Sequence, residues 1–125
     1  MNRHKPIPIV DLFAGPGGLG EGFASYKNDF DILVSAEMDQ HAHKTLKLRA
    51  YYRVLKRKCP EGLDDYYRFC NGESDNPWSE HTKEYWQEAA EEAQQLTLGE
   101  EASNNKLDKI IKKGLDHNRP WVLIG

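Results

Sequence analysis

The apolar residues of the chain gather in short blocks that are separated by glycine, proline and polar turns. Residues 7–13 are apolar, rich in β-branched side chains and followed by glycines, a pattern that predicts a short strand buried on both faces. Residues 31–36 (DILVSA) and 120–125 (PWVLIG) repeat this pattern and predict two further strands. Strands of this kind are typical of parallel sheets that helices cover on both sides.

Between these predicted strands, apolar residues recur at helical spacing. We expect a helix to start within residues 20–26, and a second to run from a cap at Asp39 to an end by Pro60. Residues 61–78 are expected to be irregular because Gly62, Gly72 and Pro77 interrupt them. A third helix is predicted over residues 79–96, and a fourth from about residue 103 to residue 115.

This order of elements predicts an α/β fold with a parallel sheet. The 125 residues suffice for one domain, which we divide into a strand–helix–strand–helix unit (1–57), a helical insertion (58–98) and a final helix and strand (99–125). Aromatic side chains are frequent in and beside the insertion, and helical spacing predicts that they form a small satellite core. They are Tyr51, Tyr52, Tyr66, Tyr67, Trp78, Tyr85 and Trp86.

The net charge of −3 argues against a stand-alone nucleic-acid-binding domain, because such domains are usually basic. The charges are unevenly distributed along the chain. Residues 44–58 contain seven basic residues and no acid, whereas residues 73–101 contain nine acids and one base. We interpret the basic run as a solvated helix face that complements the helix dipole, with DNA contact as the alternative. The acidic helix over residues 80–92 is likewise expected to be solvated.

Several classes of protein are excluded by what the sequence lacks. No apolar run approaches the roughly 20 residues of a membrane span, and the N-terminus does not resemble a signal peptide. We therefore expect a cytoplasmic protein without a membrane partner. Cys59 and Cys70 lie outside any CxxC spacing, and His41 and His43 do not share a helix face. No metal site is therefore predicted.

The most informative segment is VDLFAGPGGLGEGF, residues 10–23. A strand that leads into a glycine-rich turn and then a helix exposes backbone N–H groups to a ligand. Gly15, Gly17 and Gly20 match the GxGxxG spacing, and Glu37 follows about 20 residues later. The pattern by itself fits a nicotinamide or flavin dinucleotide as well as another adenosine cofactor.

Three residues favour a ligand other than a dinucleotide. Pro16 has no N–H to donate to a diphosphate, and Phe13 offers an apolar surface instead. Asp11 places a carboxylate at the end of the first strand, where it suits an ammonium group and repels phosphate; alternatively, the N–H groups of the loop satisfy it. A ligand with adenine, ribose and a zwitterionic tail agrees with all three residues.

DLFAGPGG closely resembles the first conserved motif of the DNA (cytosine-5) methyltransferases, and SAEMDQHAHKTL, residues 35–46, resembles the second. The final WVLIG is similar to the strand that leads to their GGPPCQ-type catalytic loop. The resemblance covers residues 7–48 and 120–125, and implies a Rossmann-like fold that binds S-adenosyl-L-methionine. It assigns cofactor contacts to Asp11 (ammonium), Phe13 and Met38 (adenine), Ala14, Gly15, Gly17 and Gly18 (backbone approach) and Glu37 (ribose hydroxyls).

In this family a cysteine thiolate attacks a flipped-out cytosine, and the methyl group then moves to C5. The resemblance implies that this cysteine lies beyond Gly125, since Cys59 precedes a proline where the family's cysteine follows one. We expect the N-terminal part of a restriction–modification enzyme, which binds cofactor but does not methylate DNA by itself. DNA would be the partner of the full-length protein, and an exposed sheet edge is expected to let this chain self-associate.

Two other functions remain open on the sequence. One is a non-catalytic module that docks a partner through its helical insertion, and the other is a domain that binds NAD or FAD. Single residues also have simpler interpretations, because Glu37 can cap the following helix and Met38 can belong to the core.

Overall fold

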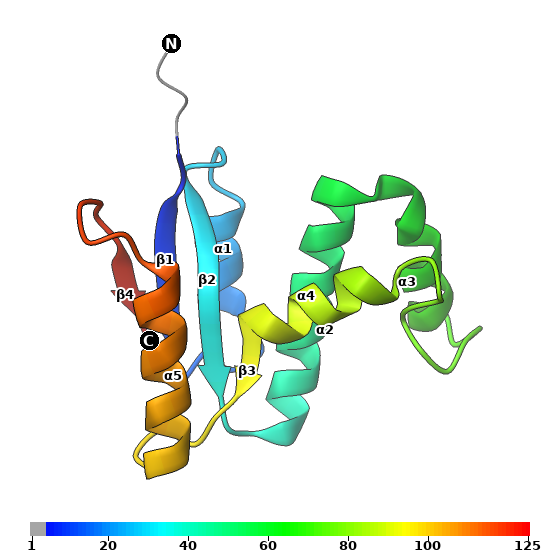
Figure 1. Ribbon diagram of the computed structural model, residues 1–125. Helices are drawn as coiled ribbons and strands as arrows, with labels where there is room; N and C mark the ends of the chain where they lie inside the picture. Colours follow the sequence, from blue (N-terminus) through cyan, green and yellow to red (C-terminus); the bar gives the residue numbers. More distant parts are fainter. Residues whose placement is uncertain (1–4) are drawn as a thin grey trace.

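The computed structural model describes residues 5–125 and shows an α/β fold with a four-stranded, fully parallel sheet (Figure 1). The strands are β1 (Ile7–Leu12), β2 (Phe30–Glu37), β3 (Ala93–Gln95) and β4 (Val122–Ile124). The helices are α1 (Gly18–Ala24), α2 (Gln40–Lys58), the short 3-10 helix η1 (Pro60–Gly62), α3 (Leu63–Cys70), α4 (Lys83–Glu92) and α5 (Glu101–Gly114).

The strand order β3-β2-β1-β4 determines where a ligand can bind. From β1 the chain adds β2 and then β3 in one direction, and it returns to place β4 on the other side of β1. In open α/β sheets ligands bind outside the carboxyl ends of the strands, at the point where the order reverses. That point lies between β1 and β4, so the loop that follows β1 occupies it.

Both faces of the sheet are covered, as the predicted strand pattern requires. Val10 and Val34 are fully buried in one core cluster, which also contains Leu107 of α5. On β2, Ile32 instead approaches Gly20 of α1. Figure 1 shows α5 in front of the sheet and α1 behind it. The prediction of a parallel α/β sheet is therefore confirmed.

Helix α2 begins where the sequence predicts. The side chain of Asp39 accepts a hydrogen bond of 2.8 Å from the N–H of Ala42, which is the expected N-cap. Leu46, Ala50 and Val54 are buried along one face. Among the described residues no helix is both long enough and apolar enough to cross a membrane.

The segment after α2 forms the predicted satellite core. Tyr51 lies edge-on to Trp86, with ring centroids 5.2 Å apart, and Tyr52 packs on Tyr66 at 5.0 Å. Ala50 and Ala89 are fully buried in the same core cluster as Tyr51. This core holds α3 and α4 against α2, at the side of the sheet (Figure 1).

Two predicted elements in this region were wrong. Residues 63–70 form helix α3, although residues 61–78 were expected to be irregular. The helix predicted to reach residue 96 ends at Glu92, because Ala93 pairs with Ser35 and residues 93–95 become β3. Part of the stretch interpreted as a helical insertion is therefore an edge strand of the sheet, since pairing with β2 outweighs helix propensity there.

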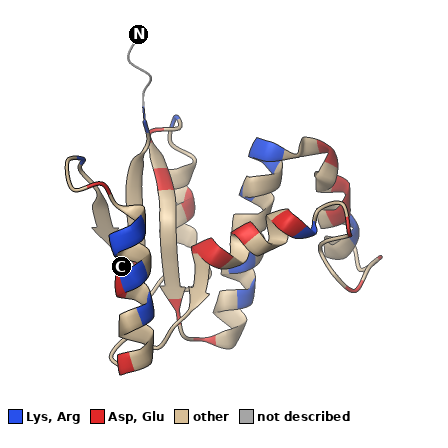
Figure 2. Cartoon of the chain, in the orientation of Figure 1, with Lys and Arg blue, Asp and Glu red and all other residues tan. Residues whose placement is uncertain are grey.

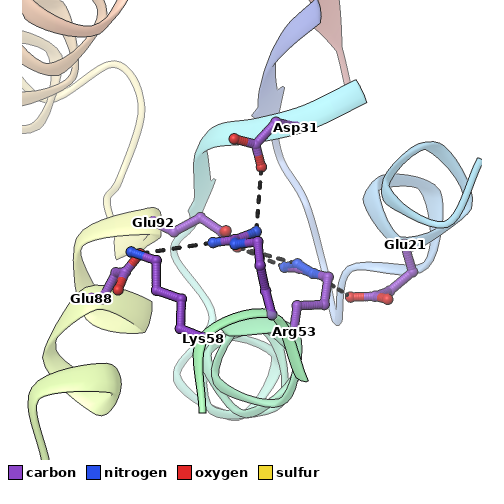
Figure 3. A network of polar contacts seen from close by, with 7 residues as sticks. Glu21, Asp31, Arg53, Lys58, Glu88 and Glu92 are labelled. Atoms are coloured by element: carbon purple, nitrogen blue, oxygen red, sulfur yellow. Dashed lines mark hydrogen bonds and ion pairs between the residues drawn. The ribbon is translucent and has the colours of Figure 1, made fainter. Parts of the chain in front are cut away.

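The basic and acidic runs were both predicted to be solvated, but they face each other. Figure 2 shows acidic positions along α4 where it crosses α2, and Figure 3 shows the contacts. The Arg53 guanidinium, whose side chain is only 18% exposed, lies 2.6 Å from the Glu92 carboxylate and 3.1 Å from that of Glu21. Lys58 pairs with Glu88 at 2.7 Å. The charge split therefore reflects two helices that dock by ion pairing.

Candidate functional site at the carboxyl edge of the sheet

The loop after β1 has the unusual backbone that its glycines predict. Gly15 and Gly17 have φ angles of 59° and 95°, in the left-handed region. A Cβ atom on Gly17 would lie 2.8 Å from Cδ1 of Leu46, so the close approach of this loop to α2 also requires glycine. Phe13 has a φ of 54°, which is strained for a residue with a side chain. Phe13 thus carries backbone strain at the start of the loop.

Glu37, at the end of β2, connects this loop to the start of α2. One carboxylate oxygen accepts a 2.8 Å hydrogen bond from the N–H of Gly15, and the other accepts a 2.7 Å bond from the N–H of Asp39. The helix-capping interpretation of Glu37 is therefore partly correct. Each oxygen accepts one bond here, and a carboxylate has about four acceptor positions, so Glu37 retains capacity for hydroxyl donors from a ligand.

Apolar side chains are exposed at the same edge. Phe13 is 70% exposed and Met38 is 62% exposed. The alternative that Met38 belongs to the core is therefore wrong. The Gln95 side chain donates to the Met38 carbonyl oxygen at 3.3 Å, which places the end of β3 beside it. Sequence analysis missed Gln95 because its strand was read as helix.

Asp11 is buried beneath the loop. It is 2% exposed, and its Oδ2 atom has no hydrogen-bond partner. Oδ2 faces Gly20, where a Cβ would lie only 3.0 Å away. Burial raises the pKa of this carboxyl above its usual value. Since the N–H groups of the loop do not satisfy Oδ2, the site contains an unpartnered buried acceptor that a cationic group would stabilise.

The loop has few N–H groups left for a ligand. The N–H of Ala14 donates to Ala36 at 3.0 Å, that of Gly15 to Glu37, and that of Gly17 to Ala14 at 3.1 Å. Pro16 has none. Residues 14–17 therefore present no unused donor to a diphosphate. Gly18, the first residue of α1, has open space where its Cβ would be.

A separate cleft lies at the other end of the sheet. It has a volume of about 770 Å³ and lies between α1, β2, α2 and α4, near the amino end of β2. Its lining includes Phe30, Tyr52 and Arg57, and none of the eight residues predicted to contact cofactor. Those eight residues flank the carboxyl ends of β1 and β2, where they form an open edge.

Part of the chain is similar to a known methyltransferase. The chain is 39% identical over 61 residues to the Type II methyltransferase M.Bpa9945I of Bacillus paralicheniformis. The match covers 49% of this chain and 13% of that protein, so the chain spans a small part of its relative. No family model and no solved structure matches the chain. The similarity supports a relationship to methyltransferases.

Proposed function

We propose that this chain binds S-adenosyl-L-methionine at the carboxyl edge of its sheet, as the cofactor-binding part of a DNA (cytosine-5) methyltransferase of a restriction–modification system. The observation that carries the proposal is the bridge from Glu37 to the loop after β1, next to two exposed apolar side chains. The similarity to a Type II methyltransferase supports a methyltransferase. The bound cofactor would supply an electrophilic methyl group.

The chemistry of the donor and acceptor groups fits this cofactor. Glu37 would accept from the ribose hydroxyls with its remaining lone pairs. Phe13 and Met38 would cover the faces of the adenine. Asp11 would lie beneath the cationic end, where its unpartnered oxygen gains an attractive charge. The backbone of Ala14, Gly15, Gly17 and Gly18 would follow the methionine part without side chains in the way.

The structure argues against a dinucleotide in the same place. A diphosphate accepts hydrogen bonds from free N–H groups of a turn and of the helix that follows it, and the turn formed by residues 14–17 offers none. The buried Asp11 carboxylate would also repel a diphosphate. The first argument depends on internal hydrogen bonds of the loop, which the sequence pattern GxGxxG does not reveal.

The two cysteines do not serve this site. Cys59 follows α2, whose 19 residues span about 28 Å from the edge where Glu37 lies. Cys70 ends α3, in the part of the chain that packs on α2. We therefore propose that the nucleophile belongs to a part of the enzyme outside these 125 residues, and that this chain binds cofactor without methylating DNA.

Isothermal titration calorimetry of the 125-residue chain tests the proposal. We expect S-adenosylhomocysteine to bind at one site, and NAD to give no heat at the same concentration. Met38→Ala should weaken binding about 2- to 10-fold, the scale of a thioether–aromatic contact. Tyr26→Ala is the matched control, because Tyr26 is 54% exposed but lies at the opposite end of α1. Binding of NAD in preference to S-adenosylhomocysteine would contradict the proposal.

A further inference from the structure

Three potential metal ligands meet at the end of α2, away from the cofactor edge. Cys59 follows α2, Glu61 belongs to η1, and His81 lies in the turn before α4. One ligand atom of each lies within 4.8 Å of the others. The distance between Cys59 Sγ and His81 Nε2 is 4.0 Å. Sequence analysis predicted no metal site, because these residues come from separate elements and lack a recognisable spacing.

The surrounding contacts hold the cluster in place. Asp65 of α3 accepts hydrogen bonds from the hydroxyls of Ser79 at 2.6 Å and Thr82 at 2.8 Å. The His81 N–H donates to the Ser79 hydroxyl at 3.2 Å. These bonds fix the backbone of the turn that carries His81 against α3, close to Cys59.

A glycine allows the two segments to approach each other. A Cβ on Gly62 would lie 2.7 Å from Cγ2 of Thr82 and 3.3 Å from Sγ of Cys59. The N–H of Gly62 also donates to the Cys59 carbonyl oxygen at 2.8 Å. Any larger residue would push the turn away from the cysteine, and the cluster therefore depends on Gly62.

We propose that Cys59, Glu61 and His81 bind a Zn²⁺ ion, with water as the fourth ligand. Thiolate, imidazole and carboxylate are the three ligand types that zinc takes in proteins. Ideal bond lengths and tetrahedral angles place sulfur and nitrogen about 3.6 Å apart, so the observed 4.0 Å requires only a small closure. The site does not depend on the proposed cofactor function.

The burial of the three side chains suits a metal site that is open to solvent on one side. Cys59 is 2% exposed, whereas Glu61 and His81 are exposed, so an ion can enter from solvent. A cysteine binds zinc as its thiolate, so metal binding would release the proton of the Cys59 thiol to solvent.

The ion would join the end of α2 to the turn before α4, across the intervening helix α3. It would thus stabilise the whole segment that packs on α2. The structural interpretation without metal is a buried thiol that lies beside an exposed carboxylate and an exposed histidine. The two interpretations differ in whether the thiol becomes a thiolate when a divalent ion is added.

Cobalt titration of the reduced, chelator-treated chain distinguishes them. We expect one equivalent of Co²⁺ to produce the near-ultraviolet thiolate-to-metal charge-transfer absorption, and one equivalent of Zn²⁺ to remove it. Zn²⁺ should also raise the melting temperature. Absence of the absorption in the wild-type chain would overturn the proposal.

Variants assign the ligands. His81→Ala and Glu61→Gln alter exposed side chains, so the fold should be retained by circular dichroism. Each substitution should weaken Co²⁺ binding by about 10- to 100-fold or more. A loss of this size is typical even when the substituted residue only hydrogen-bonds to a metal ligand. Cys70→Ser is the matched control, because Cys70 is the other cysteine of the chain and is exposed. An absorption that disappears in Cys70→Ser, or that is unaffected by His81→Ala, would overturn the assignment.

Discussion

Phe13 provides a test in which stability and ligand binding should change in opposite directions. Its φ of 54° lies in the left-handed region, which costs a residue with a Cβ about 1–2 kcal/mol. Glycine avoids this cost but loses about 0.4–1 kcal/mol through the greater freedom of the unfolded chain. Because the Phe13 side chain is 70% exposed, its removal sacrifices little packing. We therefore expect Phe13→Gly to stabilise the fold by about 0.5–1 kcal/mol, or about 2–4 °C in Tm.

The same substitution should weaken S-adenosylhomocysteine binding. Stacking of a base on an aromatic side chain contributes about 1–3 kcal/mol, which corresponds to roughly 5- to 150-fold in Kd. Differential scanning fluorimetry measures the first effect and calorimetric titration the second. At a functional site, replacing a strained residue by glycine is expected to stabilise the protein and to weaken ligand binding.

Two further variants separate the backbone from the ring. Phe13→Ala removes the ring but keeps the strain, so it should weaken binding without stabilising the fold. Lys27 also has a positive φ, of 50°, and lies in the turn between α1 and β2. Lys27→Gly should therefore stabilise the fold to a similar extent and leave binding unchanged. If Phe13→Gly binds as tightly as the wild type, the role assigned to the Phe13 ring is refuted.

Three other predictions concern packing, pH and association. Gly17→Ala should destabilise the chain by about 2–4 kcal/mol in urea unfolding, since it adds left-handed strain and a clash with Leu46; a loss below 0.5 kcal/mol would contradict the loop geometry. Burial raises the pKa of Glu92 to about 7, although the neighbouring Arg53 lowers it. The stability that protonated Glu92 contributes is therefore complete below its pKa of 4.5 in the unfolded chain, and it is lost as the pH rises through 7. Stability should therefore fall by about 3 kcal/mol between about pH 5 and pH 8 on account of this group, and Glu92→Gln should remove that part of the slope; an unchanged slope would assign the pH dependence to other groups. Among the described residues β4 pairs only with β1, and Leu123 is 57% exposed, so light scattering should detect self-association that Leu123→Lys reduces; a monodisperse wild-type monomer would contradict this.

The sequence predicted the elements that have strong local signals. β1 and β2 are continuous apolar runs, and the start of α2 has a capping aspartate. The glycines that the loop needs were also recognised, because positive φ and close approach leave few other residues possible. These features depend on neighbours in the sequence, and they place the candidate site at the end of β1.

What the sequence could not predict depends on distant partners. β3 is three residues long and includes Gln94 and Gln95, so only its pairing with β2 makes it a strand. The ion pairs of Arg53 can be predicted only when the packing of α4 on α2 is known. Glu37 was expected to contact a ligand or to cap the following helix, but the hydrogen bond that it accepts from the N–H of Gly15 was not expected. The cluster of Cys59, Glu61 and His81 is hidden for the same reason.

The central claim is that the loop after β1 and the end of β2 together bind an adenosine with a sulfonium amino-acid tail. Backbone amide chemical shifts of the isotope-labelled chain, recorded during titration with S-adenosylhomocysteine, test it most directly. The largest changes should occur at residues 13–18 and 37–39, where Gly15 and Asp39 donate to Glu37. Changes confined to the cleft lined by Phe30, Tyr52 and Arg57, or no changes at saturating ligand, would contradict the claim.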